Sequence, residues 1–349
     1  MSQQQYSGLD RFLHKLVLGS KVIQSTSFEL QQLIAPKLPK PDRPVFVVGM
    51  ARSGTTTLLN LLFATGEFES SRYRDLPLPL FPAFWRKVHK GFHQGQSPIL
   101  RAHDDGILVS PDSPEAFEEI YWDNIGNHLS EKELVQSFSY YISSIAGASG
   151  PGKRYISKNN NSLTRLGLLE KVCKEINGVI IIPIRDPLKT ATSSLRMHQR
   201  FIAMQEEDPF VLEYMNLLGH REFGKGLQWL RVGSQAFKPS YPTTEVECWL
   251  EYWMYLHSAI TQVSSVHCQM VDFDAIRSES LVNLKPMLKS CGVDSQYDQL
   301  AAMVTQEPPA KLNSVSLESP DLLSTALQLK SKLVGAAEVF SLLQRQVGA

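Results

Sequence analysis

The chain has 349 residues, and its 35 basic and 35 acidic side chains cancel to a formal net charge of zero. This balance argues against a dedicated nucleic-acid or membrane-surface binder, which would carry a basic excess. With 43% hydrophobic residues, the sequence is also too apolar for a disordered chain. We therefore expect a folded protein with either about two domains or one enlarged α/β domain.

The cysteines and the first residues indicate the class of protein. The four cysteines are widely spaced and form no CxxC pair, which predicts reduced thiols and no zinc site. Residues 1–20 lack the basic start, apolar run and cleavage site of a signal peptide. No stretch reaches the ~18 uninterrupted apolar residues of a membrane span. We expect a cytoplasmic protein with no integral membrane segment, no nucleic-acid partner and no metal.

Residues 1–43 place apolar side chains, among them Phe12, Phe28 and Leu33, at helical spacing and end in a proline-rich stretch. This pattern predicts a helical N-terminal extension that packs on the main body. The run 45–48 is short, β-branched and apolar on both faces, as in a buried central strand of a parallel sheet. A loop with two glycines follows, and a helix is expected after it.

The order of strand, turn and helix recurs further along the chain, at 153–171 and again from the apolar run VIIIPI. This recurrence predicts an α/β fold with a doubly wound parallel sheet, whose ligands bind at the carboxyl ends of the strands. We place the α/β domain at 44–300 and a C-terminal helical segment at 301–349. The stretch 205–247 is rich in glycine, proline and aromatic residues, which indicates a cap or lid or else a surface excursion without a role.

Residues 49–56 read Gly-Met-Ala-Arg-Ser-Gly-Thr-Thr and lie between the buried run and the predicted helix. Glycines let backbone N–H groups turn inward, and a helix N-terminus adds partial positive charge, so the segment predicts an anion-binding loop. A nucleoside-triphosphate loop carries lysine directly after its second glycine. Here Thr55 stands at that position and the cation is Arg52, so the loop suits another anion. The alternative is a glycine turn that only joins strand and helix.

The motif ARSGTT resembles the 5′-phosphosulfate loop of sulfotransferases that use 3′-phosphoadenosine 5′-phosphosulfate (PAPS). The second signature of that superfamily is an arginine at a strand end, followed eight residues later by a serine on a helix; Arg185 and Ser193 match it. The resemblance covers residues 44–292 and is closest to the bacterial and Golgi-type branch. It implies a P-loop-like fold and a donor site made by Arg52, Ser53, Gly54, Thr55, Thr56, Thr57, Arg185 and Ser193.

Two features of the cytosolic sulfotransferases are missing. Their adenine-stacking tryptophan is replaced by Thr57, and their C-terminal glycine-rich segment is not recognisable. How the adenine is held therefore stays open.

The resemblance also implies the reaction. Sulfuryl transfer, like phosphoryl transfer, passes through a loose in-line transition state, so positioning and electrostatics supply the catalysis. We expect transfer from PAPS to a hydroxyl or amine of a small molecule, lipid or carbohydrate, without a metal, leaving adenosine 3′,5′-bisphosphate. Arg52 would stabilise the leaving oxygen. Lys158, at the end of the run YISK, matches the lysine that contacts the sulfuryl group in relatives.

The general base is not identified by the motifs. Cytosolic relatives have a histidine two residues after that lysine, but Asn160 stands here and cannot accept a proton. Asp75 is the first candidate, because the base of Golgi-type relatives is a carboxylate about twenty residues beyond the loop cation. His103 is the second candidate. Glu118 and Glu119 are the third, although a solvated helix face explains them more simply.

The expected lid carries a polar cluster, His220, Arg221 and Glu222, which could contact the acceptor or a phosphate of the donor. Aromatic residues within 205–253 could line an acceptor pocket or belong to the core. Two other functions stay open, namely a P-loop kinase or nucleotide hydrolase and a non-catalytic protein that binds adenosine 3′,5′-bisphosphate. The sequence does not decide whether the protein is a homodimer.

Overall fold

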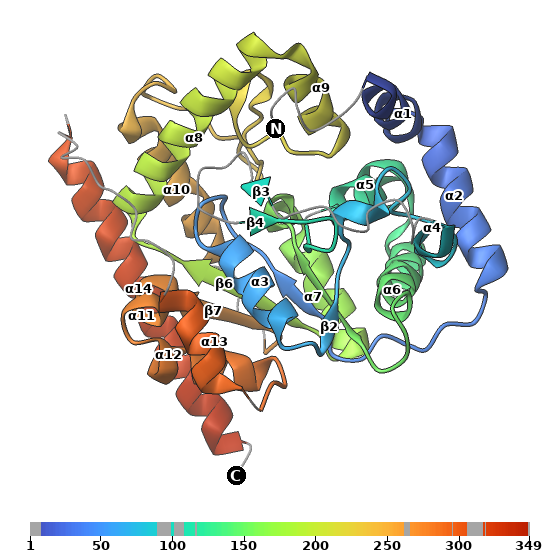
Figure 1. Ribbon diagram of the computed structural model, residues 1–349. Coiled ribbons are helices and arrows are strands. Elements are labelled where there is room, and N and C mark those ends of the chain that lie inside the picture. The colour runs from blue at the N-terminus through green and yellow to red at the C-terminus, as the bar shows by residue number, and fades with distance from the viewer. Residues whose placement is uncertain are drawn as a thin grey trace.

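A computed structural model describes residues 8–88, 99–100, 108–115, 117–261, 266–294, 296–305, 317 and 319–347. Within these residues five parallel strands form one sheet, in the order β2-β5-β1-β6-β7, with helices on both faces (Figure 1). The predicted doubly wound α/β fold is confirmed. The strands of this sheet are β1 (Val45–Val47), β2 (Phe68–Glu69), β5 (Arg154–Lys158), β6 (Val179–Ile184) and β7 (Cys268–Asp272). A separate antiparallel pair is formed by β3 (Ile99–Leu100) and β4 (Leu108–Val109).

The central strand β1 lies between β5 and β6. Val47 is in register with Lys158 on one side and with Ile181 on the other. Since all three strands run parallel, the segments that follow them emerge at one edge of the sheet. The glycine loop, the Asn160 segment and Arg185 are therefore neighbours, although they are far apart in sequence.

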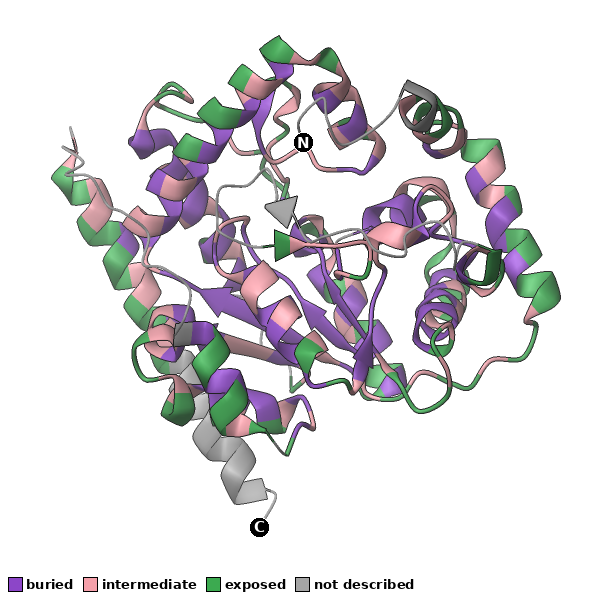
Figure 2. Ribbon diagram, viewed as in Figure 1, coloured by how far each residue is buried: buried purple, intermediate pink, exposed green. Residues whose placement is uncertain are grey.

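Two apolar layers enclose the sheet, because successive side chains of a strand point to opposite faces. On one face Val45 and Val47 pack with apolar residues of four helices. These are α3 (Thr55–Ala64), α11 (Phe273–Ser278), α12 (Ser280–Ser290) and α13 (Tyr297–Thr305). On the other face Phe46 and Tyr155 join a larger, aromatic-rich core. Figure 2 shows how completely the strands are buried between these layers.

The larger core collects most of the remaining helices. They are α5 (Glu118–Asn124), α6 (Glu131–Gly147), α7 (Leu166–Ile176), α8 (Pro187–Glu207), α9 (Pro209–Leu217), α10 (Val246–Ile260) and α14 (Pro320–Val347). The shorter elements are α4 (Pro82–Val88) and the 3-10 turns η1 (Tyr73–Asp75), η3 (Gly126–His128), η4 (Asn160–Arg165) and η5 (Gly224–Gly226). The long α14 runs beside α10 and β7, on the flank opposite the N-terminal helices (Figure 1).

The N-terminal extension forms α1 (Gly8–Leu18) and α2 (Lys21–Ile34), as predicted. The extension packs on the body, where α1 contacts α9 and α2 contacts α4 and α5. The apolar spacing does not identify the packed face, however, because Phe28 is buried but Phe12 is 60% and Leu33 73% exposed. α2 also turns polar side chains inward, since the neighbouring segments present backbone groups that need hydrogen bonds. Gln24 donates to the carbonyl oxygens of Val17 and Pro77, and Gln31 accepts from the N–H of Ala83.

The four cysteines, Cys173, Cys248, Cys268 and Cys291, are buried and form no disulfide. Across the described helices, none is both long enough and apolar enough to cross a membrane.

Candidate active site

The loop after β1 wraps tightly before α3 begins at Thr55. The Ser53 hydroxyl donates to the carbonyl oxygen of Met50 at 2.7 Å, and the backbone N–H of Ser53 donates to the same oxygen at 3.2 Å. Because that N–H is engaged in the turn, the amides that can face an anion are those around the start of α3.

Gly54 is required at its position. Its φ is +102°, in the left-handed region, and a Cβ there would lie 2.5 Å from the ring of Phe273. The backbone of Arg52 is also left-handed, with φ at +72°. Such conformations in non-glycine residues are costly, and they gather at ligand-binding sites. The loop is therefore fixed in a strained shape, with Phe273 of α11 packed against it.

The two predicted donor-binding segments meet in space. Arg52 donates through Nε to the Ser193 hydroxyl at 3.0 Å, and Arg185 donates through Nη1 to the carbonyl oxygen of Arg52 at 2.8 Å. Arg185 is only 8% exposed. Burial lowers its pKa, Asp274 opposes this, and the nearby charges of Arg52 and Arg277 lower it further. Guanidinium groups gathered in this way make a site where an anion is stabilised.

Asp274 supports this cationic group from behind. Its Oδ2 accepts a hydrogen bond from the backbone N–H of Asp186 at 2.5 Å, where α8 begins, and another from Lys330 Nζ at 2.6 Å. Burial alone would raise the pKa of Asp274, but the hydrogen bond and charge of Lys330 hold it below its ordinary value. Asp186 caps α8 by accepting from the N–H of Lys189. The start of the helix that carries Ser193 is thus fixed.

Lys158 lies at the end of β5, next to the loop. It is 7% exposed, so it is not a solvated surface lysine. Its Nζ is 3.8 Å from Oε1 of Glu115, whose Oε2 accepts from the Tyr73 hydroxyl at 2.6 Å. The ammonium is thereby paired with a carboxylate beside the loop.

Asn160 connects the loop to the cap. Its Oδ1 accepts from the Thr55 hydroxyl at 3.4 Å, and its Nδ2 donates to Oε1 of Glu222 at 2.9 Å. The next residue, Asn161, donates to the carbonyl oxygen of Gly219 at 3.0 Å. The turn after β5 therefore holds the segment 219–222 against the strand ends.

Glu222 is held among polar groups. Nδ1 of His220 lies 3.8 Å from its Oε2. Burial would raise the pKa of Glu222, but His220, Lys158 and the hydrogen bond from Asn160 lower it to about 2. The carboxylate is therefore ionised at neutral pH. The predicted polar cluster of the lid lies at the strand ends, with Arg221 turned to Asp123 at 3.1 Å.

A narrow pocket opens between the loop and the cap. Its polar side is formed by Asn160 and Glu222, next to Met50 and Ala51 of the loop. Its apolar wall consists of Phe223, Leu230, Trp249, Tyr252 and Leu256. The free volume of about 10 Å³ has room for about one water molecule. Several aromatic residues of 205–253 thus line a pocket beside the loop.

The sulfotransferase family model matches residues 44–298 of the chain. The chain belongs to the sulfotransferase family. Its fold is similar to that of sulfotransferase STF9 from Mycobacterium avium, at a TM-score of 0.55 and 11% identity, covering 96% of this chain and 87% of that one. Sulfotransferase STF1 from Mycobacterium tuberculosis H37Rv is a more distant match, at a TM-score of 0.46 and 15% identity, covering 92% and 85%. No curated protein matches the sequence.

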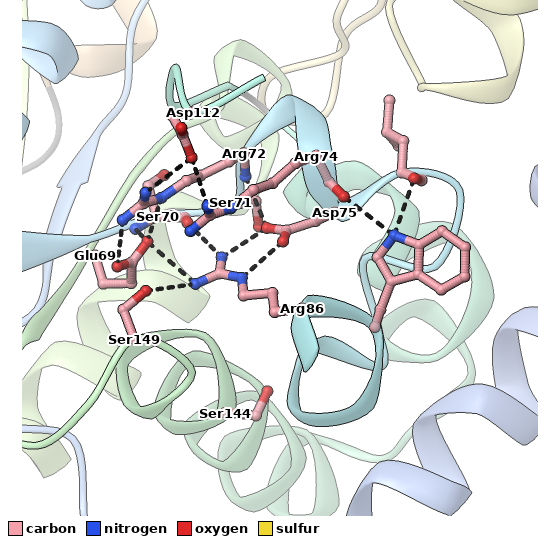
Figure 3. Close-up of polar contacts among 12 residues, drawn as sticks. Glu69, Ser70, Ser71, Arg72, Arg74, Asp75, Arg86, Asp112, Ser144 and Ser149 are labelled. Atoms are coloured by element: carbon pink, nitrogen blue, oxygen red, sulfur yellow. Dashed lines mark hydrogen bonds and ion pairs between the residues drawn. The ribbon is translucent and has the colours of Figure 1, made fainter. Parts of the chain in front are cut away.

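In this sulfotransferase Asp75, the first candidate for the base, is fully buried. Its two oxygens accept from Nε and Nη2 of Arg86 at 2.7 and 2.6 Å (Figure 3), and Oδ2 also accepts from the backbone N–H of Arg72. Glu69 lies on the other side of Arg86, at 3.3 Å. An acceptor cannot reach this carboxylate, so the geometry favours a structural role.

The other candidates for the general base are His103, Glu118 and Glu119. His103 lies outside the described residues. The expectation of a solvated helix face for Glu118 and Glu119 is wrong, because both are buried. Glu118 accepts from the hydroxyls of Tyr155 and Ser157, at 3.0 and 2.6 Å, and Glu119 pairs with Arg165. These acids satisfy polar groups of β5 and η4.

Two parts of this sulfotransferase site were not predicted from the sequence. One is the link from Thr55 through Asn160 to Glu222, and the other is Lys330, contributed by α14 near the end of the chain. In neither case does a local motif join the partners. Within the described part of the chain, no group of three or more His, Cys, Asp and Glu side chains is placed to hold a metal ion.

Proposed function

We propose that this sulfotransferase transfers the sulfuryl group of PAPS to a hydroxyl or amine of a small molecule, lipid or carbohydrate. The transfer is an in-line displacement that uses no metal, and adenosine 3′,5′-bisphosphate leaves. The observation that supports the donor best is the contact between the two signature segments. Arg52, in the loop, bonds to Ser193, and Arg185 bonds to the backbone of Arg52.

The residues present fit a donor with two anionic ends. The glycine loop and the start of α3 can receive a 5′-phosphosulfate, since the N-terminus of a helix presents backbone N–H groups and partial positive charge to an anion. Arg185 and Ser193 can receive a 3′-phosphate through a guanidinium and a hydroxyl. Thr56 and Thr57, in the first turn of α3, complete the loop end of this site.

The cations of the site carry the catalysis. PAPS, when bound, supplies an activated sulfuryl group whose S–O bond to the 5′-phosphate breaks. Arg52 and the N-terminus of α3 oppose the charge that develops on the phosphate oxygen. Lys158, at the adjacent strand end, is placed to hold the sulfuryl oxygens. Its neighbour Glu115 pairs with it and holds it in position.

Calorimetric titration with adenosine 3′,5′-bisphosphate, with ATP and magnesium in parallel, tests the donor. We expect binding of the bisphosphate and none of the magnesium nucleotide, since Thr55 stands where a kinase loop has lysine. Binding of ATP alone would contradict the proposal and favour a kinase or hydrolase. Binding of the bisphosphate without sulfated product from any acceptor would leave a non-catalytic binding protein.

A further inference from the structure

The strand end after β5 has an asparagine where cytosolic relatives have their histidine, so the position itself cannot accept a proton. What the structure puts in contact with that asparagine is a carboxylate. Asn160 donates to Oε1 of Glu222 at 2.9 Å and accepts from Thr55 of the sulfuryl-binding loop at 3.4 Å. Glu222 is therefore fixed two hydrogen bonds away from the loop.

Glu222 is also more accessible than the other carboxylates considered for the base. Of the described residues that line the pocket beside Met50 and Ala51, it is the one that carries a carboxylate. Its side chain is 16% exposed. Asp75 is fully buried against Arg86, and Glu118 accepts hydrogen bonds from two hydroxyl groups of β5. Glu115 also approaches Lys158, but it is bonded to Tyr73 and does not line the pocket.

We propose that Glu222 is the general base that takes the proton of the acceptor, an inference that rests on the proposed function. As the acceptor oxygen bonds to sulfur, its O–H bond breaks and the proton moves to the Glu222 carboxylate. The sulfur–oxygen bond to the 5′-phosphate breaks at the same time, and the bisphosphate leaves with that electron pair. Asn160 and His220 are positioning residues, because each holds one oxygen of the carboxylate.

The charges around Glu222 make its basicity depend on the donor. Without ligand, Lys158 and His220 hold its pKa at about 2, so it is ionised but a weak base. Arg221, the other charged residue of the segment, is turned to Asp123 on α5. An anionic sulfuryl group placed against Lys158 adds negative charge beside the carboxylate, which raises its pKa. Glu222 thus becomes a better base when the donor is in place.

The test compares acceptors that do and do not need a base. Phenol keeps its proton at mildly alkaline pH, whereas 4-nitrophenol, of nearly the same size, is largely ionised. Release of the bisphosphate from PAPS is measured with phenol, with 4-nitrophenol and with water alone. For Glu222→Gln we expect a loss of roughly 10²- to 10⁴-fold with phenol and water, the usual effect of removing a general base. Transfer to 4-nitrophenol should be largely retained.

Glu115→Gln is the matched control, because it removes the other carboxylate beside Lys158. It should lower transfer to both phenols by the same factor.

Calorimetry with the bisphosphate distinguishes loss of the base from loss of the fold. Unchanged binding by Glu222→Gln shows that the fold and the donor site are intact. An equal loss of transfer to both phenols in Glu222→Gln would overturn the assignment of Glu222 as the general base. A loss with phenol but not with 4-nitrophenol in His220→Gln, while Glu222→Gln stays active, would also overturn this assignment. The base would then be the imidazole of His220. A wild type that binds no bisphosphate refutes the proposed function itself. A wild type that binds the bisphosphate but releases no bisphosphate from PAPS overturns both the proposed reaction and the assignment of Glu222 as the base.

Discussion

Arg52 is oriented by residues from outside its own loop. Ser193 accepts its Nε–H, and Arg185 bonds to its backbone carbonyl, so guanidinium and backbone are fixed before a ligand arrives. Preorganised charge of this kind is worth most where charge develops in the transition state. The left-handed backbone at Arg52, at φ +72°, is the conformational cost of that arrangement.

We expect Arg52→Ala to lower kcat roughly a hundredfold, since it removes leaving-group stabilisation of about 3 kcal/mol. Bisphosphate binding should fall less than kcat, because Arg185 and the loop amides remain. Steady-state kinetics together with calorimetry separates the two effects. Full activity of this variant would contradict the assigned loop chemistry.

Asp75 gives a second prediction at this scale. Asp75→Asn leaves the buried guanidinium of Arg86 without its main partner, and breaking a buried ion pair costs about 3–5 kcal/mol. We expect that loss in the unfolding free energy measured by urea denaturation. The folded fraction should keep its ratio of phenol to 4-nitrophenol transfer. A stable variant with a selective loss for phenol would instead support Asp75 as the base.

Individual site residues could be predicted from the sequence where a local motif carries them. The loop from Arg52 to Thr56 and the pair Arg185 and Ser193 each belong to one strand–turn–helix unit, and the fold brings the units together. The contact between Asn160 and Glu222 could not be predicted, because it spans 62 positions and depends on how the cap folds back. The burial of polar residues such as Glu118 could not be predicted either, because it depends on hydrogen-bond partners that lie on another element.

At the scale of elements, β1 and β6 were the easiest to predict, because a strand buried on both faces is a continuous apolar run. Helices were harder where polarity and burial disagree. The helical part of the unit predicted at 153–171 begins as the 3-10 turn η4 before α7, since the side chain of Asn159 turns the chain by accepting a hydrogen bond from the N–H of Asn161. In α2 the buried side includes Gln24 and Gln31, so the apolar spacing identified a helix but not its packed face.

The helix α10 contains a buried titratable group that predicts a pH dependence of stability. His257 is 1% exposed, its ring stacks on Trp253, and burial lowers its pKa to about 4 from an ordinary 6.5. As pH falls from 6.5 towards 4, the unfolded chain binds a proton that the folded chain does not. The unfolding free energy should therefore fall by about 3 kcal/mol across this window from this residue alone.

His257→Phe keeps an aromatic ring against Trp253 and removes the titration. We expect its unfolding free energy to depend less steeply on pH between these two pKa values than that of the wild type. Urea denaturation of both proteins at several pH values in the window measures the difference. Parallel curves would mean that His257 is protonated equally in both states.

At the scale of the whole molecule, the proposed donor site depends on both ends of the α/β domain and on the C-terminal helix. Phe273 of α11 packs against Gly54 of the loop after β1. Asp274 supports the proposed 3′-phosphate side, and Lys330 of α14 donates a hydrogen bond to it. The family match ends at residue 298, before α14 begins. The C-terminal helix is therefore an addition to the matched region that reaches the back of the predicted site.

Lys330→Met tests this dependence. Without the ammonium, Asp274 loses its closest cation and attracts Arg185 more strongly, in competition with a bound phosphate. We expect bisphosphate binding to weaken about three- to tenfold, a change of roughly 1 kcal/mol, as for a partly buried ion pair. Lys332→Met, on the exposed side of the same helix, is the control and should leave binding unchanged. If calorimetry gives both variants the wild-type dissociation constant, α14 packs against the domain without contributing to the charge of the donor site.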